Sequence, residues 1–360
     1  MIFKTLALVM AVSAWTDAKP GYVWSFPSDH WAHDGYKTEW WYFTGQLDVD
    51  GKPRFGYQFT IFKVGLAEAD TAPGSSWSTR TLLMGHAAVT DFKTGEHRFS
   101  EVLQRTTPFL AGFGVEPDKR IAWTRAAPGT DGTWELTLEP EGFAFAMTDM
   151  RQKFAMTLTT SLAKPIILEG AGGLSIKGKG EKAASLYYSE TRLTTRGKVM
   201  LDGVTYDAAG ESWMDKEFGS SLLGKDQMGW DWFSLQLADG RDLMLYMLRR
   251  ADGTFDFASG TLVAKDGMAR YIGRKDFTAA GDGEWMSPAS GARYPAHWRV
   301  QVPFAAIDIE VTPISPAQEN VSMLVPKMYY WEGAVRVSGS TGGRGFVELT
   351  GYGEGAKPAL

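Results

Sequence analysis

The sequence predicts an all-β protein in which two related units of antiparallel strands pack together. Three observations support this fold class: Asp-Gly pairs typical of tight turns, segments in which large apolar and polar residues alternate, and two motifs that recur in the same order. With 360 residues, 44% of them apolar, the chain can bury a substantial core. Few segments have the periodicity of an amphipathic helix, so we expect little helix.

Turns and strands alternate along the chain. Residues 55–61 and 307–312 each place large apolar side chains at every second position, which puts them on one face of a strand. Asp-Gly tolerates the positive φ angles of two-residue hairpin turns, so strands on either side of such a pair are expected to be neighbours. The pair occurs eight times, starting at Asp34, Asp50, Asp131, Asp202, Asp239, Asp252, Asp266 and Asp282.

An internal repeat divides the chain. WWYFTGQLDVDG, starting at residue 40, matches WDWFSLQLADG at residue 230, and YYSETRLTTRG at residue 187 matches YYWEGAVRVSG at residue 329. The two matches keep the same order, which indicates a duplication. We therefore expect an N-terminal domain over residues 19–222 and a C-terminal domain over residues 223–360, with Trp40 and Trp230 as equivalent core residues.

The first residues resemble a signal peptide. Lys4 precedes a short apolar run, and small residues allow cleavage after Ala14 or Ala18, so residues 1–18 are expected to be a targeting segment. The run is shorter than the roughly 20 residues that a membrane-spanning helix needs, and no other segment comes near that length. We expect an exported protein, periplasmic or secreted, without stable insertion into a membrane.

Composition excludes several classes of function. The chain has no cysteine, which rules out disulfides, thiolate metal sites and a cysteine nucleophile. Its net charge is −5, and no run of like charges provides the positive surface that nucleic acid binding needs. No G-x-S-x-G motif supports a serine hydrolase, and the five histidines lack metal-ligand spacing. We expect neither a metal site nor a nucleic acid partner.

Five ordered motifs resemble a known family: TEWWYFTGQL, YYSETRL, GESWMDKEFGSSLL, GWDWFSLQLADGRDLMLYMLR, and YWEGAVRV followed by GFVELTGY. Over about residues 20 to 352 the chain resembles the AttH-type secreted proteins, lipocalin-like relatives of carotenoid 1,2-hydratase. The resemblance implies two lipocalin-like antiparallel β-barrels packed together. It also implies a site for a long apolar or amphiphilic molecule, such as an isoprenoid, a carotenoid or a lipid, which a barrel of about eight strands can enclose.

The resemblance leaves three functions open. Carotenoid hydratases add water to an isoprenoid double bond, so a hydratase-like lyase is the first. AttH-type proteins are commonly encoded beside lipoprotein-exporter-like ABC permeases, so a noncatalytic periplasmic accessory of such a permease is the second. A lipocalin-like cyclase, similar to fungal proteins that promote Diels–Alder closure, is the third. All three bind an apolar small molecule, and none is expected to need a cofactor.

Hydration of an unactivated alkene needs a carboxylic acid that burial keeps protonated and aromatic faces that stabilise a cation. Asp215 and Glu217 point to the same face if their segment is a strand, and Asp231 follows between two tryptophans. These three carboxylates are the catalytic candidates, although they could instead make structural hydrogen bonds between the barrels. The candidates for substrate binding are Trp41, Tyr188, Trp230, Trp232 and Tyr246.

Three other residues, Glu39, His86 and Arg192, belong either to the site or to the framework. Glu39 is a desolvated acid or pairs with Arg54, Arg80 or Arg192, and His86 is a proton shuttle or a hydrogen-bonded strand residue. The chain also departs from the hydratases. Where they have a histidine and a tryptophan in a D-H-x-W-G-like segment, this chain has Lys216 and Phe218.

Overall fold

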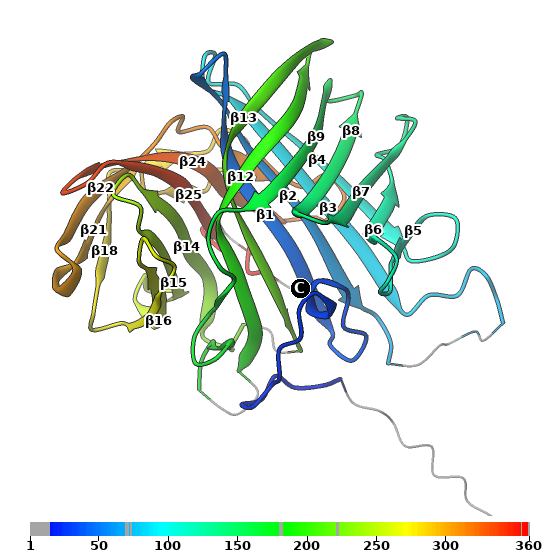
Figure 1. Cartoon of the computed structure of the whole chain (residues 1–360), viewed down its shortest axis with the longest axis horizontal. Helices are drawn as coiled ribbons and strands as arrows, with labels where there is room; N and C mark the ends of the chain where they lie inside the picture. The colour runs from blue at the N-terminus through cyan, green and yellow to red at the C-terminus, as the bar shows by residue number, and fades with distance from the viewer. Residues whose placement is uncertain are drawn as a thin grey trace, which may run out of the picture.

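The computed structural model describes residues 15–68, 72, 74–179, 183–220, 223–353 and 355–358. Apart from two short 3-10 helices, η1 (Ser28–His30) and η2 (Pro303–Ala305), the regular structure of these residues is β, as predicted. Residues 1–14 of the predicted signal peptide lie outside the described part. Two large antiparallel sheets lie side by side, one a nearly closed barrel and the other a half-barrel (Figure 1).

The first sheet has thirteen strands, and its main path runs β4-β3-β2-β1-β13-β12-β9-β8-β7-β6-β5. Two short strands, β10 and β11, pair with β12 outside that path. The strands are β1 (Thr38–Val49), β2 (Lys52–Gly65), β3 (Thr81–Asp91), β4 (His97–Arg105), β5 (Ala111–Phe113), β6 (Arg120–Arg125), β7 (Thr133–Glu139), β8 (Gly142–Asp149), β9 (Phe154–Leu162), β10 (Ile167–Leu168), β11 (Leu174–Ile176), β12 (Ala184–Leu201) and β13 (Val204–Gly219).

The second sheet has ten strands, with the main path β17-β16-β15-β14-β25-β24-β22-β21-β18 and β23 beside β24. A separate pair, β19 (Trp285–Met286) and β20 (Arg293–Tyr294), completes this half. The strands of the sheet are β14 (Gln227–Leu237), β15 (Asp242–Arg250), β16 (Phe255–Val263), β17 (Ala269–Gly273), β18 (Thr278–Asp282), β21 (His297–Val302), β22 (Ile307–Pro313), β23 (Glu319–Val321), β24 (Tyr329–Gly339) and β25 (Gly343–Thr350).

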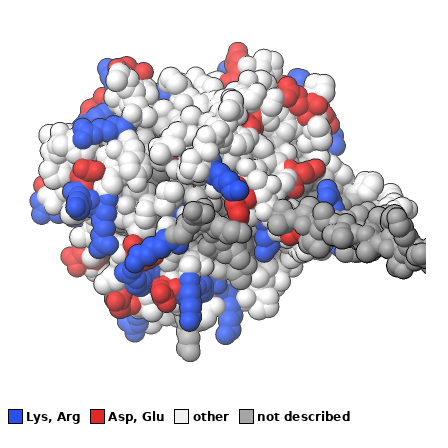
Figure 2. Space-filling view, turned by 90° about the horizontal axis from the view of Figure 1, so that it is seen from below, with Lys and Arg blue, Asp and Glu red and all other residues white. Residues whose placement is uncertain are grey.

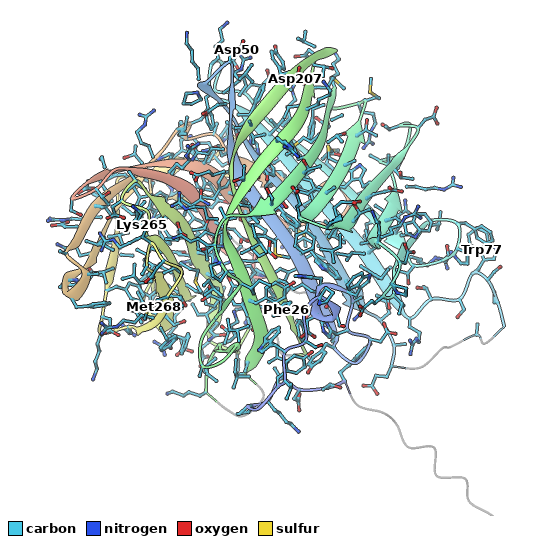
Figure 3. All side chains as sticks on the ribbon, viewed as in Figure 1. Phe26, Asp50, Trp77, Asp207, Lys265 and Met268 are labelled. Carbon is cyan, nitrogen blue, oxygen red and sulfur yellow. The ribbon has the colours of Figure 1, made fainter. Side chains whose placement is uncertain are left out.

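Two of the Asp-Gly pairs make two-residue hairpin turns. Asp50-Gly51 joins β1 to β2, and Asp202-Gly203 joins β12 to β13, with positive φ at all four residues. This is the conformation of a type I′ hairpin turn, which Asp-Gly adopts at low cost. Figure 3 shows both hairpins at the same end of the first sheet, marked by Asp50 and by Asp207 of β13. Because β1 also pairs with β13, the two hairpins form the centre of that sheet.

The sequence repeat corresponds to equivalent strands. The order β3-β2-β1-β13-β12 in the first sheet matches β16-β15-β14-β25-β24 in the second. Trp40 and Trp230 lie on the matched strands β1 and β14, and the two tyrosine motifs lie on β12 and β24. The predicted division between residues 222 and 223 falls in the connection from β13 to β14, where residues 221 and 222 are outside the described part.

Aromatic and aliphatic side chains fill the interior of each sheet. These inward-pointing side chains pack against one another, and the cavity described below lies between the two sheets, whereas the expected ligand site is inside a barrel. The filling residues of the first interior include Trp41, Phe43, Phe59, Trp134, Phe143, Phe145 and Phe154, and those of the second include Phe233, Trp298, Val300, Ile309, Trp331 and Val347.

The two sheets meet through the faces that point away from these interiors. The Gln46 amide on β1 donates to the carbonyls of Val335 and Gly345, at 2.9 and 3.0 Å. The equivalent Gln236 on β14 donates to the carbonyls of Thr191 and Ser212, both at 2.9 Å. Each sheet therefore contributes one buried glutamine whose amide donates to two backbone carbonyls of the other sheet.

Among the described residues, no helix has the length and hydropathy that crossing a membrane requires. On the face shown in Figure 2, basic and acidic side chains are interspersed, so neither sign of charge dominates that face.

Candidate functional site

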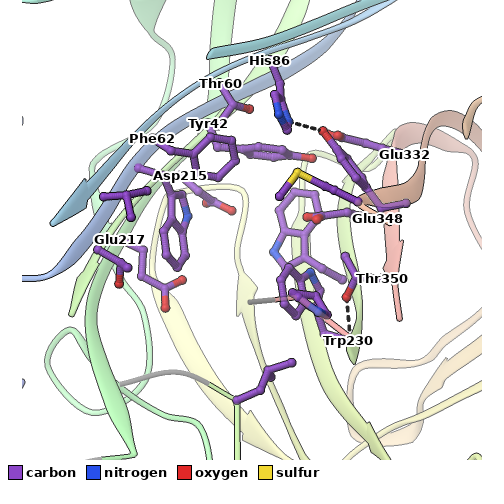
Figure 4. A pocket seen from close by; sticks show the side chains of 18 of the residues that line it. Tyr42, Thr60, Phe62, His86, Asp215, Glu217, Trp230, Glu332, Glu348 and Thr350 are labelled. Atoms are coloured by element: carbon purple, nitrogen blue, oxygen red, sulfur yellow. Dashed lines mark hydrogen bonds between the residues drawn. The ribbon is translucent and has the colours of Figure 1, made fainter. Parts of the chain in front are cut away.

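A cavity of about 360 Å³ lies between the two sheets (Figure 4). One wall comes from β1, β2, β3, β12 and β13, and the other from β14, β15, β24 and β25. Residues 325–328, before β24, and residues 355–358, near the C-terminus, also line it. The candidate site is thus a property of the packed pair of sheets and of neither sheet alone.

Strand register places the polar residues of the cavity in two rows. In the first sheet, Asp215, Tyr42, Thr60 and His86 are successive Cα partners across β13, β1, β2 and β3. In the second sheet, the corresponding row across β24, β25, β14 and β15 is Glu332, Glu348, Trp232 and Tyr246. Side chains on one row of a sheet point to the same face, so each row contributes to one wall of the cavity.

Asp215 is a buried carboxylate with three donors. Its Oδ1 accepts from Ser189 Oγ at 2.5 Å and Trp213 Nε1 at 2.7 Å, and its Oδ2 accepts from the Tyr187 hydroxyl at 2.6 Å. Burial raises the pKa of Asp215 to about 7, although the three donors act in the opposite direction. These bonds hold the carboxylate in place and leave one lone pair of Oδ2 free.

Glu217 lies on the same face of β13, closer to solvent. Lys177 Nζ lies 2.8 Å from its Oε1, and Ser185 donates a hydrogen bond to the same oxygen. The Lys177 ammonium also sits 4.0 Å from the centre of the Tyr246 ring. A carboxylate already paired with a cation and a hydroxyl is a poor proton donor, so Glu217 positions Lys177 at the edge of the aromatic wall.

Glu332 and Glu348 form a pair of opposed carboxyl groups on β24 and β25. Burial raises the pKa of both groups, and repulsion from Glu348 raises that of Glu332 further. The hydrogen bond from the Asn320 amide to Glu332 is long, 3.4 Å, and Glu332 Oε1 has no well-formed hydrogen bond among the described residues. Two neighbouring carboxyls with so little stabilisation of negative charge cannot both ionise at neutral pH, so the pair retains a proton.

Asp215 and the Glu332–Glu348 pair have different surroundings, which suit them to different roles. Asp215 has three donors that favour its ionised form, whereas the glutamate pair has a proton and a free oxygen that faces the cavity. Glu348 remains half-buried because it opens onto the cavity beside Trp230. The pair is therefore the better source of a proton, and Asp215 is the better acceptor.

Aromatic faces surround these acids. Tyr42 and Trp232 pack edge to face across the interface with ring centroids 5.2 Å apart, and Trp232 Nε1 donates to the Tyr187 hydroxyl at 3.3 Å. Trp40 and Trp230 line the cavity and are only half-buried. The expectation that Trp40 and Trp230 are core residues is therefore wrong. They occupy equivalent positions, but these positions face the cavity between the sheets.

His86 contributes a buried imidazole to the inner part of the cavity. Its Nδ1 lies 2.7 Å from the hydroxyl of Tyr330, which belongs to the other sheet (Figure 4). Burial lowers the pKa of His86 to about 3, so the ring is neutral, and its Nε2 has no hydrogen-bond partner among the described residues. The residue thus joins the two sheets and also presents one free nitrogen.

Three of the eight residues expected to be catalytic or to bind substrate lie outside the cavity. Trp41 and Tyr188 are fully buried and point into the first sheet's interior, because the alternation along β1 and β12 directs their neighbours, Trp40 and Tyr187, toward the cavity. Asp231 accepts from the Tyr352 hydroxyl at 3.0 Å and lies 3.4 Å from Arg249 Nε, on the opposite face of β14 from Trp230 and Trp232. Trp230, Trp232 and Tyr246 do line the cavity, as do Asp215 and Glu217.

Glu39 belongs to a buried ion network. Lys216 Nζ donates to it, His33 Nδ1 lies 2.6 Å away, and Lys63 Nζ lies 3.6 Å away. Burial alone would raise the pKa of Glu39, but Lys216, His33 and Lys63 outweigh it and hold the pKa at about 2. The expected arginine partners are wrong, since Arg54 pairs with Asp91 and Arg192 with Asp242.

Arg192 also holds the sheets together. Its guanidinium on β12 bridges Glu211, at 2.9 Å, and Asp242 of the second sheet, at 2.6 Å. It lies outside the cavity. Among the described residues, no group of three or more His, Asp or Glu side chains is arranged to hold a metal ion.

Sequence reasoning missed Glu348 and did not assign Glu332 to the site. The repeat contains the signal that finds Glu348: extending it by one strand aligns SWMDKEFG with FVELTGY, which makes Glu348 the equivalent of Asp215. Register agrees, because Asp215 faces Tyr42 while Glu348 faces Trp232 on the matched strand.

The fold and this interface cavity define a class, lipocalin-like proteins made of two packed β-sheet units. A sequence model of the AttH-like family matches residues 17–352, and the chain belongs to this family. No curated protein matches it.

Solved structures that are similar to the chain include the following two. One, described as an AttH from Nitrosomonas europaea, is 30% identical, with a TM-score of 0.81 over 94% of this chain and 99% of that one. The other is kievitone hydratase from Nectria haematococca, 13% identical, with a TM-score of 0.63 over 94% of this chain and 96% of that one. At the latter identity the similarity shows the fold alone.

Proposed function

We propose that the chain is a hydratase-type lyase that adds water to a carbon–carbon double bond of an apolar, isoprenoid-like molecule held between the sheets. The observation that carries this proposal is the pair of opposed glutamates, Glu332 and Glu348, in an aromatic cavity. The similarity to kievitone hydratase in fold supports the same reaction class.

The cavity volume limits the size of the substrate. Pockets for small molecules span roughly 300 to 1,000 Å³, and this cavity, at about 360 Å³, is near the lower limit. It suits a short isoprenoid, or one end of a longer molecule that extends through the opening near residues 325–328 and 355–358. The cavity is too small to hold a whole carotenoid.

The reaction begins with proton transfer from the glutamate pair to one alkene carbon. The π electrons form the new C–H bond and leave a cation on the other carbon, which the faces of Trp230, Trp232 and Tyr246 stabilise. A water oxygen then bonds to that carbon, and its surplus proton passes to the free lone pair of Asp215 Oδ2. Return of this proton to the glutamate pair through the site water restores the enzyme, and the net change is one added water.

This mechanism predicts how activity depends on pH. The pair must carry a proton, and burial raises the pKa of Glu348 to about 7, above that of an ordinary glutamate. Activity should therefore be highest near pH 7: above it the glutamate pair loses its proton, and well below it Asp215, whose pKa burial also raises to about 7, is protonated and cannot accept a proton. A pH profile of kcat at saturating substrate measures this, and activity that rises between pH 7 and 9 would contradict the assignment.

The decisive variant is Glu348→Gln, with Glu190→Gln as its matched control. Glu190 is also a buried glutamate, with a pKa that burial raises to about 8, but it lies outside the cavity. Purified proteins are incubated with geraniol in ¹⁸O-labelled water, and products are analysed by mass spectrometry. We expect the wild type and Glu190→Gln to give a product heavier by one labelled water, and Glu348→Gln to lose activity by about 100-fold or more.

The product mass also distinguishes the other functions. A product isomeric with the substrate would favour a cyclase. Ligand binding without any product, over a panel of short isoprenoids, would favour a noncatalytic binding protein such as an accessory of an exporter. Full activity in Glu348→Gln and in Glu332→Gln would refute the role of the pair.

A further inference from the structure

Four buried polar atoms that have no well-formed hydrogen bond among the described residues belong to side chains in the wall of the cavity. They are Tyr42 Oη, Gln58 Oε1, His86 Nε2 and Glu332 Oε1, and each belongs to a residue that is at least nine-tenths buried. The four come from β1, β2, β3 and β24, so both sheets contribute. All four residues line the same cavity.

Such a cluster is costly unless something binds it. A buried polar group without a partner costs roughly 1 to 3 kcal/mol, and most buried polar groups in proteins are paired. Structural partners already occupy the other polar atoms of these side chains: Gln58 Nε2 donates to Thr60, and His86 Nδ1 contacts Tyr330. The free atoms are therefore available to a bound molecule.

The chemistry of the free atoms indicates an uncharged oxygen group. Tyr42 supplies a hydroxyl donor and Gln58 a carbonyl acceptor, while the neutral His86 nitrogen and the Glu332 carboxyl complete a set that can bind a hydroxyl or a carbonyl. An anionic group is disfavoured by Glu332, Glu348 and Asp215, and two lysines of the cavity wall are engaged elsewhere. Lys63 donates to the carbonyls of His33 and Tyr36, and Lys177 pairs with Glu217.

We infer that Tyr42, Gln58, His86 and Glu332 form a subsite for a hydroxyl or carbonyl oxygen on an otherwise apolar substrate. This inference rests on the proposed function, because it describes the substrate of the same cavity. Glu348 lies one strand beyond Glu332, a spacing of about 5 Å. The substrate therefore carries its oxygen within a few bonds of the double bond that receives the proton.

Binding measurements test the subsite without any need for turnover. Five compounds share one carbon skeleton and differ at one end: geraniol, geranial, 2,6-dimethyl-2,6-octadiene, geranic acid and geranylamine. Their affinities are measured by quenching of tryptophan fluorescence, since Trp40, Trp230 and Trp232 line the cavity. We expect the alcohol or the aldehyde to bind at least about tenfold more tightly than the hydrocarbon, the acid and the amine.

Tyr42→Phe removes one donor from the subsite, and Tyr57→Phe is its matched control. The Tyr57 hydroxyl is also buried, but it bonds to Ser212 at 2.6 Å, outside the cavity. Tyr42→Phe should reduce the preference for the oxygenated compounds about three- to tenfold and leave hydrocarbon affinity unchanged. It should also lower the melting temperature less than Tyr57→Phe does, because the Tyr42 hydroxyl makes no well-formed hydrogen bond among the described residues, whereas Tyr57→Phe breaks one and should keep the preference.

Several results would overturn the inference. These are equal affinity for the hydrocarbon and the oxygenated compounds, tightest binding of the acid or the amine, an unchanged preference in Tyr42→Phe, or no binding of any of the five. The subsite and the reaction can fail separately. Selective binding without hydration in the labelled-water assay would refute the proposed function alone, and hydration without selectivity would refute the subsite alone.

Discussion

Glu39 and Lys216 illustrate, at the scale of single residues, how alternation along a strand separates roles. Lys216 lies between Asp215 and Glu217 in sequence but points to the other face of β13, where its ammonium sits 3.5 Å from the centre of the Trp41 ring. The position at which the hydratases have histidine is thus outside the cavity in this chain. The presence of Lys216 in place of that histidine is therefore no argument against acid catalysis by residues on the opposite face of β13.

The buried ion pair should respond strongly to loss of one partner. Lys216→Met leaves the Glu39 carboxylate with weaker compensation, at 0% exposure, and we expect it to destabilise the protein by about 3 to 5 kcal/mol in urea denaturation. The double variant Glu39→Gln with Lys216→Met should recover part of this loss, because the two closest charges are removed together and Lys63 keeps its bonds to the carbonyls of His33 and Tyr36. Equal destabilisation in the single and the double variant would contradict this account of the pair.

The residue scale also shows what sequence can and cannot predict about a site. Asp215 and Glu217 were placed on one face of a strand, and both line the cavity. Trp41 is the predicted substrate-binding residue, but Trp40 is the one that lines the cavity. The prediction fails because both faces of β1 are buried, one by the barrel interior and one by the second sheet. An alternating pattern identifies two faces, but it cannot tell which of two apolar faces borders a cavity.

The two glutamines that join the sheets make a prediction at the scale of elements. Gln46→Met or Gln236→Met would leave two buried carbonyls on the facing strands without their donor. We expect each to cost about 1 to 3 kcal/mol in chemical denaturation, whereas the exposed Gln152→Met should change stability by less than about 0.5 kcal/mol. A cost near zero for both glutamines would show that these two side chains contribute nothing to holding the sheets together.

The N-terminal segment makes a second prediction at this scale. Cleavage after Ala14 or after Ala18 fits the sequence, but Ala18 is buried among residues that include Phe218, and Thr16 bonds with Gly35 and Ser220. Cleavage after Ala18 would remove these contacts. If the protein is exported, sequencing of its mature N-terminus should begin at Trp15, and a start at Lys19 would contradict the prediction.

Strand positions were predictable because their causes are local. Asp-Gly turns and alternating patterns identify hairpins such as β1–β2 and β12–β13, and the repeat relates β1 to β14. The pairing of Glu332 with Glu348 was not predictable from such features alone. It depends on the register of β24 with β25 and on the packing of the second sheet over the first, both of which are long-range.

At the scale of the whole molecule, duplication explains why the site lies between the sheets. Equivalent strands of the two halves provide the faces that meet at the interface, and each half contributes an equivalent carboxyl group, Asp215 or Glu348. The halves then differ in detail: Asp215 has three donors, whereas Glu348 is opposed by Glu332. One half therefore favours an ionised carboxylate and the other a protonated acid, which is the combination that addition of water requires.

The most direct test of this account is a crystal structure of Glu348→Gln with geraniol. The account predicts electron density for one molecule between the sheets, with its carbon chain against Trp230 and Trp232 and its hydroxyl within hydrogen-bond distance of Tyr42 or His86. Density inside the interior of either sheet, or an empty cavity at ligand concentrations that saturate fluorescence quenching, would contradict the claim that the interface between the sheets is the functional site.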